Sequence, residues 1–399
     1  MAVRSARISL LGSAVTVALS LAGAGLHAAD LARVRFAQFN VWELSRRKVD
    51  EVDAQGRGAN PQLRKAAEIV QRVRPDVLLV NEIDGDGGAT GRLFRDRYLA
   101  VGQNGQRGLS YPHLFTAPVN TGVPSGLDLD NNGRLGDPED AYGFGRYPGE
   151  FGMALYSAYP IDAAGARTFQ KLLWQDVPGH LMPDGRGGRP AFYAERTAAA
   201  LRLSSKSHWD VPVRIGRTAV HVLAAHPTLQ VFDGPEDRNG RRNFDEIRLL
   251  ADYVRGGDGA RYIVDDAGRR GALPPDALFV VMGDMNSDPA RDEAPYGRRG
   301  MEQLLSLPRV QDPAPTSPGA IDGGAPGSPQ RLERRTSNYG RADYVLPSRG
   351  LAVVDSGVFW PAPGDPRRAL VDEPQAASDH RLVWVDVDVP AAPRPAAGR

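Results

Sequence analysis

An apolar run followed directly by polar side chains marks the segment from Phe279 to Pro289. The run ends at Gly283, and Asp284 and Asn286 follow it. Residues two apart in an extended chain point to the same side, so a carboxylate there can take a proton from water while a carboxamide donates to an anionic oxygen. An ordinary Asp/Asn turn after a strand is the alternative interpretation. The segment predicts a buried strand that ends at a reaction centre.

Polar residues of the same kinds stand at the ends of other strand-like runs. They are Asn40, Glu82, His226, Asp343, Asp379 and His380. Carboxylate and amide oxygens without cysteine are hard ligands, which suit magnesium, manganese or calcium. A histidine next to a carboxylate is typical of proton transfer beside a divalent ion. These residues predict a metal-assisted acid–base site.

Several of these residues also have an ordinary structural interpretation. Asn40 could cap a turn, and His226, which precedes Pro227, could be a hydrogen-bonded histidine of the core. Asp343 could form a structural salt bridge with Arg341 or another arginine.

The segment from Asp128 to Glu139 matches the spacing of the twelve-residue calcium loop. Asp128, Asp130 and Asn132 fall at ligand positions 1, 3 and 5, Gly133 at the turn position 6, and Glu139 at position 12. Prolines and glycines flank the segment where the paired helices of an EF-hand would lie, so a solvated acidic turn is the alternative. The spacing predicts calcium as a second, structural ion.

The composition limits the protein classes that remain. The chain has 399 residues, 41% of them apolar, with 45 glycines, 32 prolines and no cysteine. The lack of cysteine excludes disulfides, thiolate metal sites and a cysteine nucleophile. The formal net charge of +1 gives no overall basic field of the kind that attracts nucleic acid. Abundant glycine and proline favour short elements joined by long loops.

The first 29 residues have the pattern of a secretory signal. Arg4 and Arg7 precede an apolar, small-residue run from Ile8 to Leu26, and alanines follow at the expected cleavage point. The run approaches the roughly 20 residues that span a bilayer, so an uncleaved anchor is the alternative. We expect an exported protein, periplasmic or secreted, with a C-terminal tail at residues 389–399 that does not pack.

Hydrophobic periodicity predicts strands and two helices. The predicted strands cover residues 34–42, 77–80, 153–157, 198–203, 218–225, 279–283, 343–346 and 382–385. One helix is predicted from Pro61 to before Pro75, and another from Asn243 to Gly256. Residues 84–150, rich in glycine, aspartate and proline, predict a long surface insertion. The irregular alternation favours one domain with mixed or antiparallel sheets covered by helices.

Five short motifs resemble, in their order and spacing, the endonuclease/exonuclease/phosphatase family. They are Asn40, Asn81-Glu82, Gly283-Asp284-Met285-Asn286, Asp343-Tyr344-Val345-Leu346 and Ser378-Asp379-His380. The resemblance covers residues 33–386, within a domain of residues 30–388. It implies a four-layer α/β sandwich, in which two packed, mixed and mainly antiparallel sheets have helices outside. It also implies a metal-dependent phosphoesterase site at the strand ends.

The resemblance implies a set of ligands for the catalytic ion. Glu82 corresponds to the principal ligand of a magnesium or manganese ion. Asn40 and Asp379 would contribute to the coordination of the same ion, directly or through other groups.

The resemblance also implies catalytic roles. Asp284 would position the attacking water and Asn286 the phosphoryl oxygens. His380, oriented by Asp343, would bind or protonate the region of the scissile phosphate. His226 is a candidate general acid.

These observations predict an exported, divalent-metal-dependent hydrolase of phosphoester bonds that prefers phosphodiesters. The alternatives are an extracellular nuclease, a phosphomonoesterase, or a catalytically idle binding protein of the same fold. The arginines are too dispersed to indicate a phosphate-binding track for nucleic acid. The expected substrate is a phosphoester, with nucleic acid and a phospholipid headgroup as candidates, and a monomer without a dedicated protein partner is expected.

Overall fold

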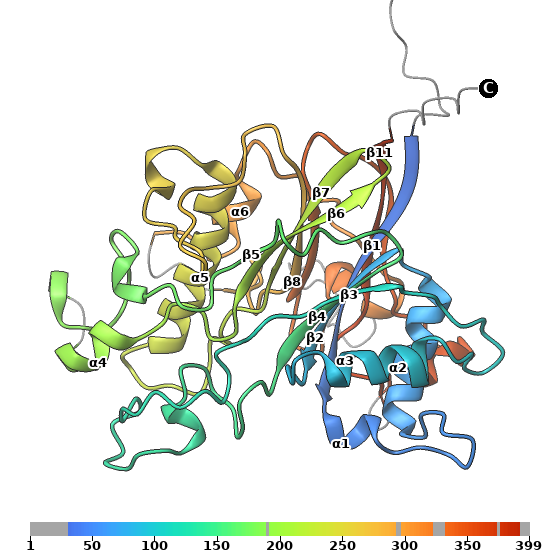
Figure 1. The fold of residues 1–399 in the computed structure, drawn as a ribbon, viewed down its shortest axis with the longest axis horizontal. Coiled ribbons are helices and arrows are strands. Elements are labelled where there is room, and N and C mark those ends of the chain that lie inside the picture. Colours follow the sequence, from blue (N-terminus) through green and yellow to red (C-terminus); the bar gives the residue numbers. More distant parts are fainter. Residues whose placement is uncertain (1–30, 189–190, 293–296, 322–331, 373–375, 392–399) are drawn as a thin grey trace, which may run out of the picture.

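Two β-sheets packed face to face form the centre of the computed structural model (Figure 1). The strands of the first sheet lie in the order β10 (Ala352–Val358), β11 (Val383–Pro390), β1 (Leu31–Leu44), β2 (Val77–Ile83), β4 (Gly152–Ser157) and β3 (His113–Phe115). Those of the second lie in the order β5 (Arg167–Thr168), β6 (His208–Ile215), β7 (Thr218–Ala225), β8 (Leu278–Asp284) and β9 (Asp343–Pro347). Both sheets are mixed, and antiparallel pairs predominate.

The structure describes residues 31–188, 191–292, 297–321, 332–372 and 376–391. The predicted signal segment, residues 1–29, lies outside them, as does most of the predicted tail. Within these ranges no helix is long and apolar enough to cross a membrane.

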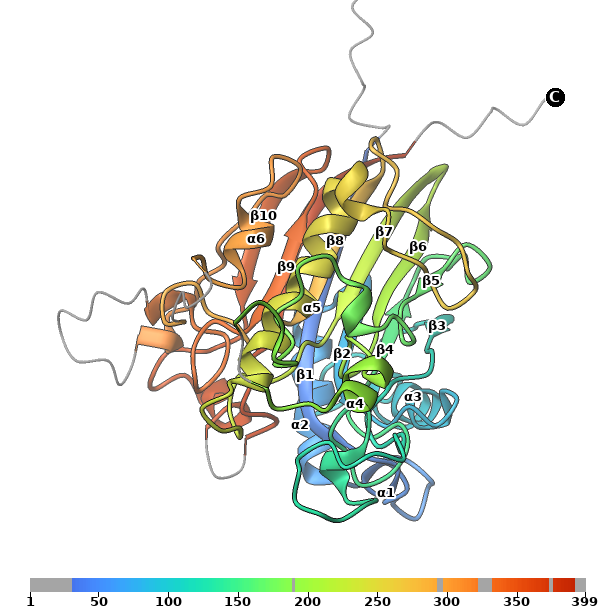
Figure 2. The same ribbon diagram turned by 90° about the vertical axis from the view of Figure 1, so that its left-hand side faces the viewer.

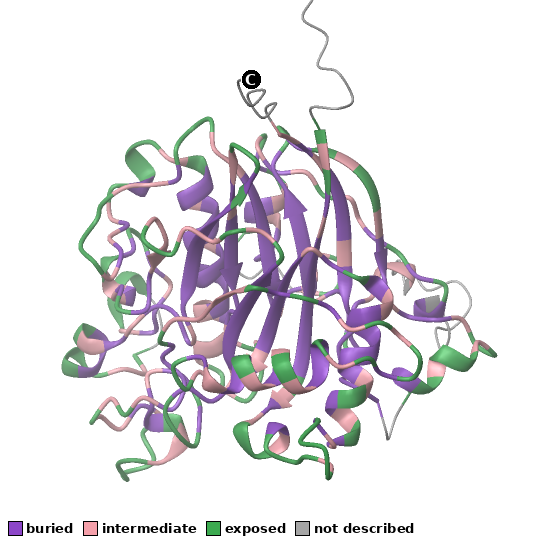
Figure 3. Cartoon of the chain, turned by 45° about the vertical axis from the view of Figure 1, so that its right-hand side comes forward, coloured by how far each residue is buried: buried purple, intermediate pink, exposed green. Residues whose placement is uncertain are grey.

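Helices cover the outer faces of the two sheets (Figures 1 and 2). On the first sheet lie α2 (Pro61–Val73), α3 (Ala89–Phe94) and a π-helical turn (Arg95–Leu99). On the second lie α5 (Arg238–Arg255) and α6 (Glu302–Leu305), while α1 (Arg46–Val49) and α4 (Glu195–Ala200) are short helices in connections. The buried strands fill the space between these layers (Figure 3). The predicted four-layer sandwich is therefore confirmed.

The first predicted helix forms with the predicted bounds. The side chain of Asn60 caps it by accepting from the backbone N–H of Leu63, and Pro61 occupies the first turn, where no intrahelical N–H is needed. Arg74 ends it in a left-handed conformation (φ 55°), one residue before Pro75. The second helix, α5, begins at Arg238, five residues before the predicted start at Asn243.

Strand direction brings the predicted site residues to one edge of the sandwich. β1 runs parallel to β2, and β7 runs parallel to β8, so their carboxyl ends lie side by side in pairs. β9 and β11 run antiparallel to their neighbours, so their amino ends lie at that same edge. Residues from six strands therefore meet there although they are far apart in the chain.

Two features of the secondary structure differ from the sequence analysis. Residues 198–203 do not form a strand, because residues 195–200 are helix α4, as three consecutive alanines favour. The strand that pairs with β7 is instead β6, which the sequence did not predict.

The predicted insertion at residues 84–150 and the predicted tail also need correction. Phe94, Tyr98 and Tyr111 are buried in the core, and β3 pairs with β4, so the first part of the insertion belongs to the sandwich. Val389 is fully buried and pairs with Ala32 in β1, so β11 extends into the segment expected not to pack.

Candidate active site

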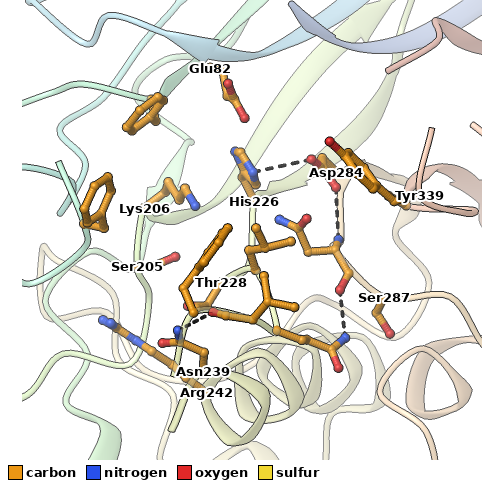
Figure 4. Close-up of a pocket in the computed structure, with 18 of the residues that line it drawn as sticks. Glu82, Ser205, Lys206, His226, Thr228, Asn239, Arg242, Asp284, Ser287 and Tyr339 are labelled. Atoms are coloured by element: carbon orange, nitrogen blue, oxygen red, sulfur yellow. Dashed lines mark hydrogen bonds and ion pairs between the residues drawn. The ribbon is translucent and has the colours of Figure 1, made fainter. Parts of the chain in front are cut away.

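The strand ends open into a cleft of about 1060 Å³ (Figure 4). Six of the residues predicted for catalysis or for the catalytic ion line it: Glu82, His226, Asp284, Asn286, Asp379 and His380. The other two, Asn40 and Asp343, are fully buried and hydrogen bond to residues of this lining. The structure thus brings all eight together.

Asn40 joins carboxylates from both sheets. Its Nδ2 donates to Oε1 of Glu82 (2.9 Å) in the first sheet and to Oδ2 of Asp284 (3.0 Å) in the second. Its Oδ1 accepts from the backbone N–H of Trp42 (3.0 Å). In this arrangement Asn40 positions the two carboxylates and turns its own oxygen away from them, so it is a hydrogen-bond donor to the carboxylates and not an oxygen ligand.

His380 and Asp343 form a buried pair. Nδ1 of His380 lies 2.9 Å from Oδ2 of Asp343, which also accepts from the Thr336 hydroxyl (2.8 Å). Burial disfavours the cation, but the charges of Asp343 and Asp284 outweigh it and raise the pKa of His380 well above its usual value. These two carboxylates therefore favour the protonated form of the imidazole. Arg341 pairs with Asp312, so the alternative salt bridge with Asp343 does not form.

Asp284 is held in a setting that disfavours its charge. It is 1% exposed, and this burial, with repulsion from Asp343, raises its pKa to about 7 against the attraction of His380. Nε2 of His380 lies 3.6 Å from Oδ2 of Asp284, and Oδ1 accepts from the backbone N–H of Asn286 (3.0 Å). A carboxylate with such a pKa is matched to proton transfer near neutral pH.

His226 lies beside Asp284 in this site. Its Nε2 lies 3.5 Å from Oδ2 of Asp284, and its buried Nδ1 has no hydrogen-bond partner among the described residues. Burial, with repulsion from Lys206 and His380, lowers its pKa well below the usual value. The general-acid role of His226 stays a prediction.

Asn286 links the segment after β8 to the segment after β7 through hydrogen bonds. Its Nδ2 donates to the Pro227 carbonyl (3.0 Å), and its own carbonyl accepts from Nε2 of Gln230 (2.7 Å). It adopts a left-handed conformation (φ 49°), as does Glu82 (φ 61°). Of the eleven non-glycine residues with positive φ in the described chain, six line the cleft. Such strain is typical of functional sites.

The carboxylates at the cleft fit a hard divalent cation. Asp284, Asp343 and His380 each offer a ligand atom within 4.8 Å of the others. Because Nδ1 of His380 already bonds to Asp343, we infer that oxygens of Glu82 and Asp379 would hold the ion. This assignment leaves Asp284 free to accept a proton from water.

Lys206 is the site residue that the sequence analysis missed. It lines the cleft on the side of His226 (Figure 4), and its ammonium group has no hydrogen-bond or ion-pair partner in the described part of the chain. Burial lowers its pKa, although Glu246, Glu82 and Asp284 attract the charge. It is one of four lysines in a chain with 49 basic residues, and this rarity was the one signal available.

Glu246 of α5 positions the segments that carry Lys206 and His226. It is fully buried, and its carboxylate accepts from the backbone N–H groups of Ser205 (2.7 Å) and Thr228 (2.6 Å). One side chain therefore fixes the chain before β6 and the chain after β7 against each other.

The predicted calcium loop forms an acidic cluster, one member of which, Asp130, also lines the cleft. Asp128, Asp130 and Asp140 each offer a carboxylate oxygen within 4.8 Å of the others. The side chain of Asn132 donates to Asp130 (2.9 Å). Glu139 is exposed and lines the active-site cleft, and the structure places its neighbour Asp140 in the cluster instead.

Comparison with known proteins gives a consistent family. Among solved structures, an endonuclease/exonuclease/phosphatase from Beutenbergia cavernae DSM 12333 is similar, with 18% identity over 91% of this chain and 73% of that chain and a TM-score of 0.50. A family protein from Leptotrichia buccalis C-1013-b (13% identity, 89% and 99% coverage, TM-score 0.45) and truncated Caenorhabditis elegans TDP2 (15%, 90% and 98%, 0.42) are also similar. No curated protein shows a significant match. The sequence profile of the Endonuclease/Exonuclease/phosphatase family matches residues 37–380, so the chain belongs to this family.

Proposed function

We propose that this protein is a divalent-metal-dependent hydrolase of phosphoester bonds, and specifically a phosphodiesterase. Membership of a family of phosphoester hydrolases supports the general class. The single observation that carries the proposal is the bond network in which Asn40 links Glu82 to Asp284, next to the His380–Asp343 pair. This network supports the proposal because it joins side chains that suit the roles of a base, a cation and metal ligands.

The chain's own groups divide the reaction between them. Magnesium or manganese, held by Glu82 and Asp379, supplies positive charge to the phosphoryl oxygens when bound. Asp284 accepts a proton from water as the new oxygen–phosphorus bond forms, and the bond to the leaving oxygen breaks. The leaving oxygen takes a proton from solvent. The cationic imidazole of His380, oriented by Asp343, stabilises negative charge that develops on the phosphoryl group.

The charges along the cleft favour a substrate with one phosphoester over a polyanion. Eight carboxylate residues and five lysine or arginine residues line the cleft. Arg341 is paired with Asp312, Arg238 with Glu236, and Arg242 donates to backbone carbonyls. Nucleic-acid binding needs cations that follow several phosphates, so this lining does not favour a nuclease.

Turnover by the purified mature chain tests the proposal. After removal of bound metal, the protein is supplied with magnesium or manganese and offered bis(para-nitrophenyl) phosphate, para-nitrophenyl phosphate and duplex DNA. We expect hydrolysis of the diester that is faster than that of the monoester and is lost in chelator. Faster cleavage of DNA would favour the nuclease, faster cleavage of the monoester would favour the phosphomonoesterase, and no turnover at all would favour the idle binding protein.

We also propose that residues 1–29 direct export and are removed. The basic residues, apolar run and small residues in that order support this proposal. N-terminal sequencing of the protein from its native host should start near Ala29 or Asp30. A sequence that starts at Met1 or Ala2 would instead favour the uncleaved anchor.

A further inference from the structure

Exposed apolar side chains gather at the active-site cleft. Eleven large hydrophobic side chains are exposed among the described residues, and six of them line this cleft. We call these six the apolar rim: Trp42, Phe144, Leu229, Val231, Phe232 and Tyr339. Soluble proteins seldom gather exposed apolar side chains in one place unless that place contacts a ligand, a partner or a membrane.

Three residues of the apolar rim, Leu229, Val231 and Phe232, belong to one loop that hydrogen bonds hold in place. The loop follows β7, and its polar residue Gln230 turns inward, where Nε2 donates to the carbonyl of the catalytic-site residue Asn286 (2.7 Å). Nδ2 of Asn239 donates to the Val231 carbonyl (2.7 Å). Because these bonds hold the backbone in place, the loop presents its apolar side chains outward without needing to rearrange.

Phe232 is the most exposed residue of the apolar rim. Its side chain and backbone are 85% exposed, so most of its ring has no protein surface against it. Its backbone has φ 67°, a conformation that bulky residues rarely adopt. Trp42, another aromatic residue of the rim, shares this strain, since its backbone has φ 45°. Strained, exposed aromatic residues beside a reaction centre indicate a binding role.

The charges that line the cleft limit the kinds of ligand or surface that the apolar rim can bind. The excess of carboxylates over cations opposes a surface of dense negative charge, whether nucleic acid or anionic lipid. Four of the six rim residues are aromatic and could stack on nucleobases, so it is the charge of the cleft that argues against nucleic acid. Leucine, phenylalanine and tryptophan, which the rim contains, also insert into the interfacial region of a lipid layer. A zwitterionic phospholipid offers an apolar layer next to a phosphodiester of low net charge.

We propose that the apolar rim docks the protein on a zwitterionic phospholipid surface, so that a phosphodiester headgroup enters the cleft. This inference rests on the proposed function and names its substrate class. Water adds to phosphorus and one ester bond breaks, which releases an alcohol and a phosphomonoester without any change of oxidation state. The rim would make the cleft open onto the lipid surface from which the substrate comes.

Sedimentation with vesicles tests the docking directly. The full mature protein, loaded with magnesium, is mixed with sucrose-filled phosphatidylcholine vesicles, and the bound fraction is measured. We expect binding that is weaker when part of the lipid is replaced by phosphatidylserine. Phe232→Ala should weaken binding about tenfold, the effect expected for one large apolar side chain withdrawn from water.

A matched control separates the rim from exposed apolar surface in general. Leu229 and Val354 are both 44% exposed, but Val354 lies on β10 and does not line the cleft. Leu229→Ala should weaken vesicle binding, whereas Val354→Ala should leave it unchanged. Equal effects of the two substitutions, or equal binding by parent and Phe232→Ala, would overturn the proposal.

Turnover distinguishes failure of docking from failure of the proposed function. The same proteins are assayed on phosphatidylcholine vesicles and on bis(para-nitrophenyl) phosphate. We expect Phe232→Ala to lose about tenfold more activity on vesicles than on the soluble diester. Soluble turnover without vesicle binding by the parent would overturn the docking and leave the phosphodiesterase intact. Binding of single-stranded DNA that depends on Phe232, in place of vesicle binding, would assign the rim to nucleic acid.

Discussion

Nδ2 of Asn40 lies 3.0 Å from Oδ2 of Asp284, although the two residues belong to different sheets. The same nitrogen also donates to Glu82 (2.9 Å), so a single amide fixes the distance between two carboxylates that come from the two halves of the sandwich. The distance between Glu82 and Asp284 therefore depends on how the two sheets pack against each other.

Glu82→Gln should weaken the hold on the catalytic ion more than it weakens substrate binding. The substitution removes a formal charge from an oxygen site but keeps a side chain of the same shape. We expect the concentration of magnesium or manganese needed for half-maximal activity to rise about tenfold or more. Metal titration of the rate measures this. An unchanged metal requirement would show that Glu82 does not contact the ion.

Lys206→Met should lower kcat for a phosphodiester by about tenfold or more, because it removes a cation from a desolvated site. Lys206→Arg, which keeps the charge, should retain more activity. Lys171→Met is the control, since Lys171 is an exposed lysine that does not line the cleft. If Lys206→Met and Lys171→Met have the same kcat, Lys206 has no part in the reaction.

In chelator, proton release from Asp284 between pH values of about 4 and about 7, and from His380 above about 6.5, should lower the unfolding temperature. Both Asp284, with a pKa of about 7, and His380, with a raised pKa, bind protons more tightly in the folded than in the unfolded chain. The raised pKa of Asp284 makes its ionisation costly to the fold, and the stabilisation from His380 is lost as its proton leaves.

The buried histidines with lowered pKa values act in the opposite direction only at lower pH, as they gain protons below about 6.5. The histidines are present in both proteins, so the unfolding temperature of the parent relative to that of Asp284→Asn should fall between pH values of about 4 and about 7, as followed by circular dichroism. An equally steep dependence in this variant would show that Asp284 does not contribute.

Calcium should stabilise the fold through the cluster of Asp128, Asp130 and Asp140. At about a hundredfold over its dissociation constant, the ion should add roughly 2.7 kcal/mol to the free energy of unfolding. Asp130→Asn should reduce the rise in unfolding temperature, whereas Asp276→Asn, at an exposed carboxylate outside this loop, should not. The catalytic metal is held constant. The same rise in all three proteins would mean that calcium acts elsewhere.

The sequence predicted the parts of this structure that local pattern determines. The apolar runs before Asn81 and Asp284, and the one after His380, lie in β-strands or lead into them, so the polar residues beside them could be assigned to strand ends. The helix from Pro61 had both a start and a stop signal. The order of these motifs was then enough to predict the layered fold.

The parts that the sequence did not predict depend on tertiary contacts. β6 carries polar residues, and Asp210 within it is satisfied by Tyr253 of α5 (2.6 Å) and His221 of β7 (2.6 Å), which no local pattern shows. Lys206 reaches the cleft because buried Glu246 holds the adjacent backbone. The lowered pKa of His226 likewise follows from burial and from the charges of Lys206 and His380, which come from other parts of the chain.

Steady-state hydrolysis of bis(para-nitrophenyl) phosphate by the parent and by Asp284→Asn tests the central claim most directly. Both proteins are freed of metal and then supplied with magnesium or manganese, and Asp96→Asn, an exposed carboxylate, serves as the control. We predict that parent turnover requires the metal, that Asp284→Asn loses about a hundredfold or more in kcat while its circular dichroism is unchanged, and that Asp96→Asn matches the parent. Parent turnover that persists in chelator, or an Asp284→Asn variant with the kcat of the parent, would contradict the account.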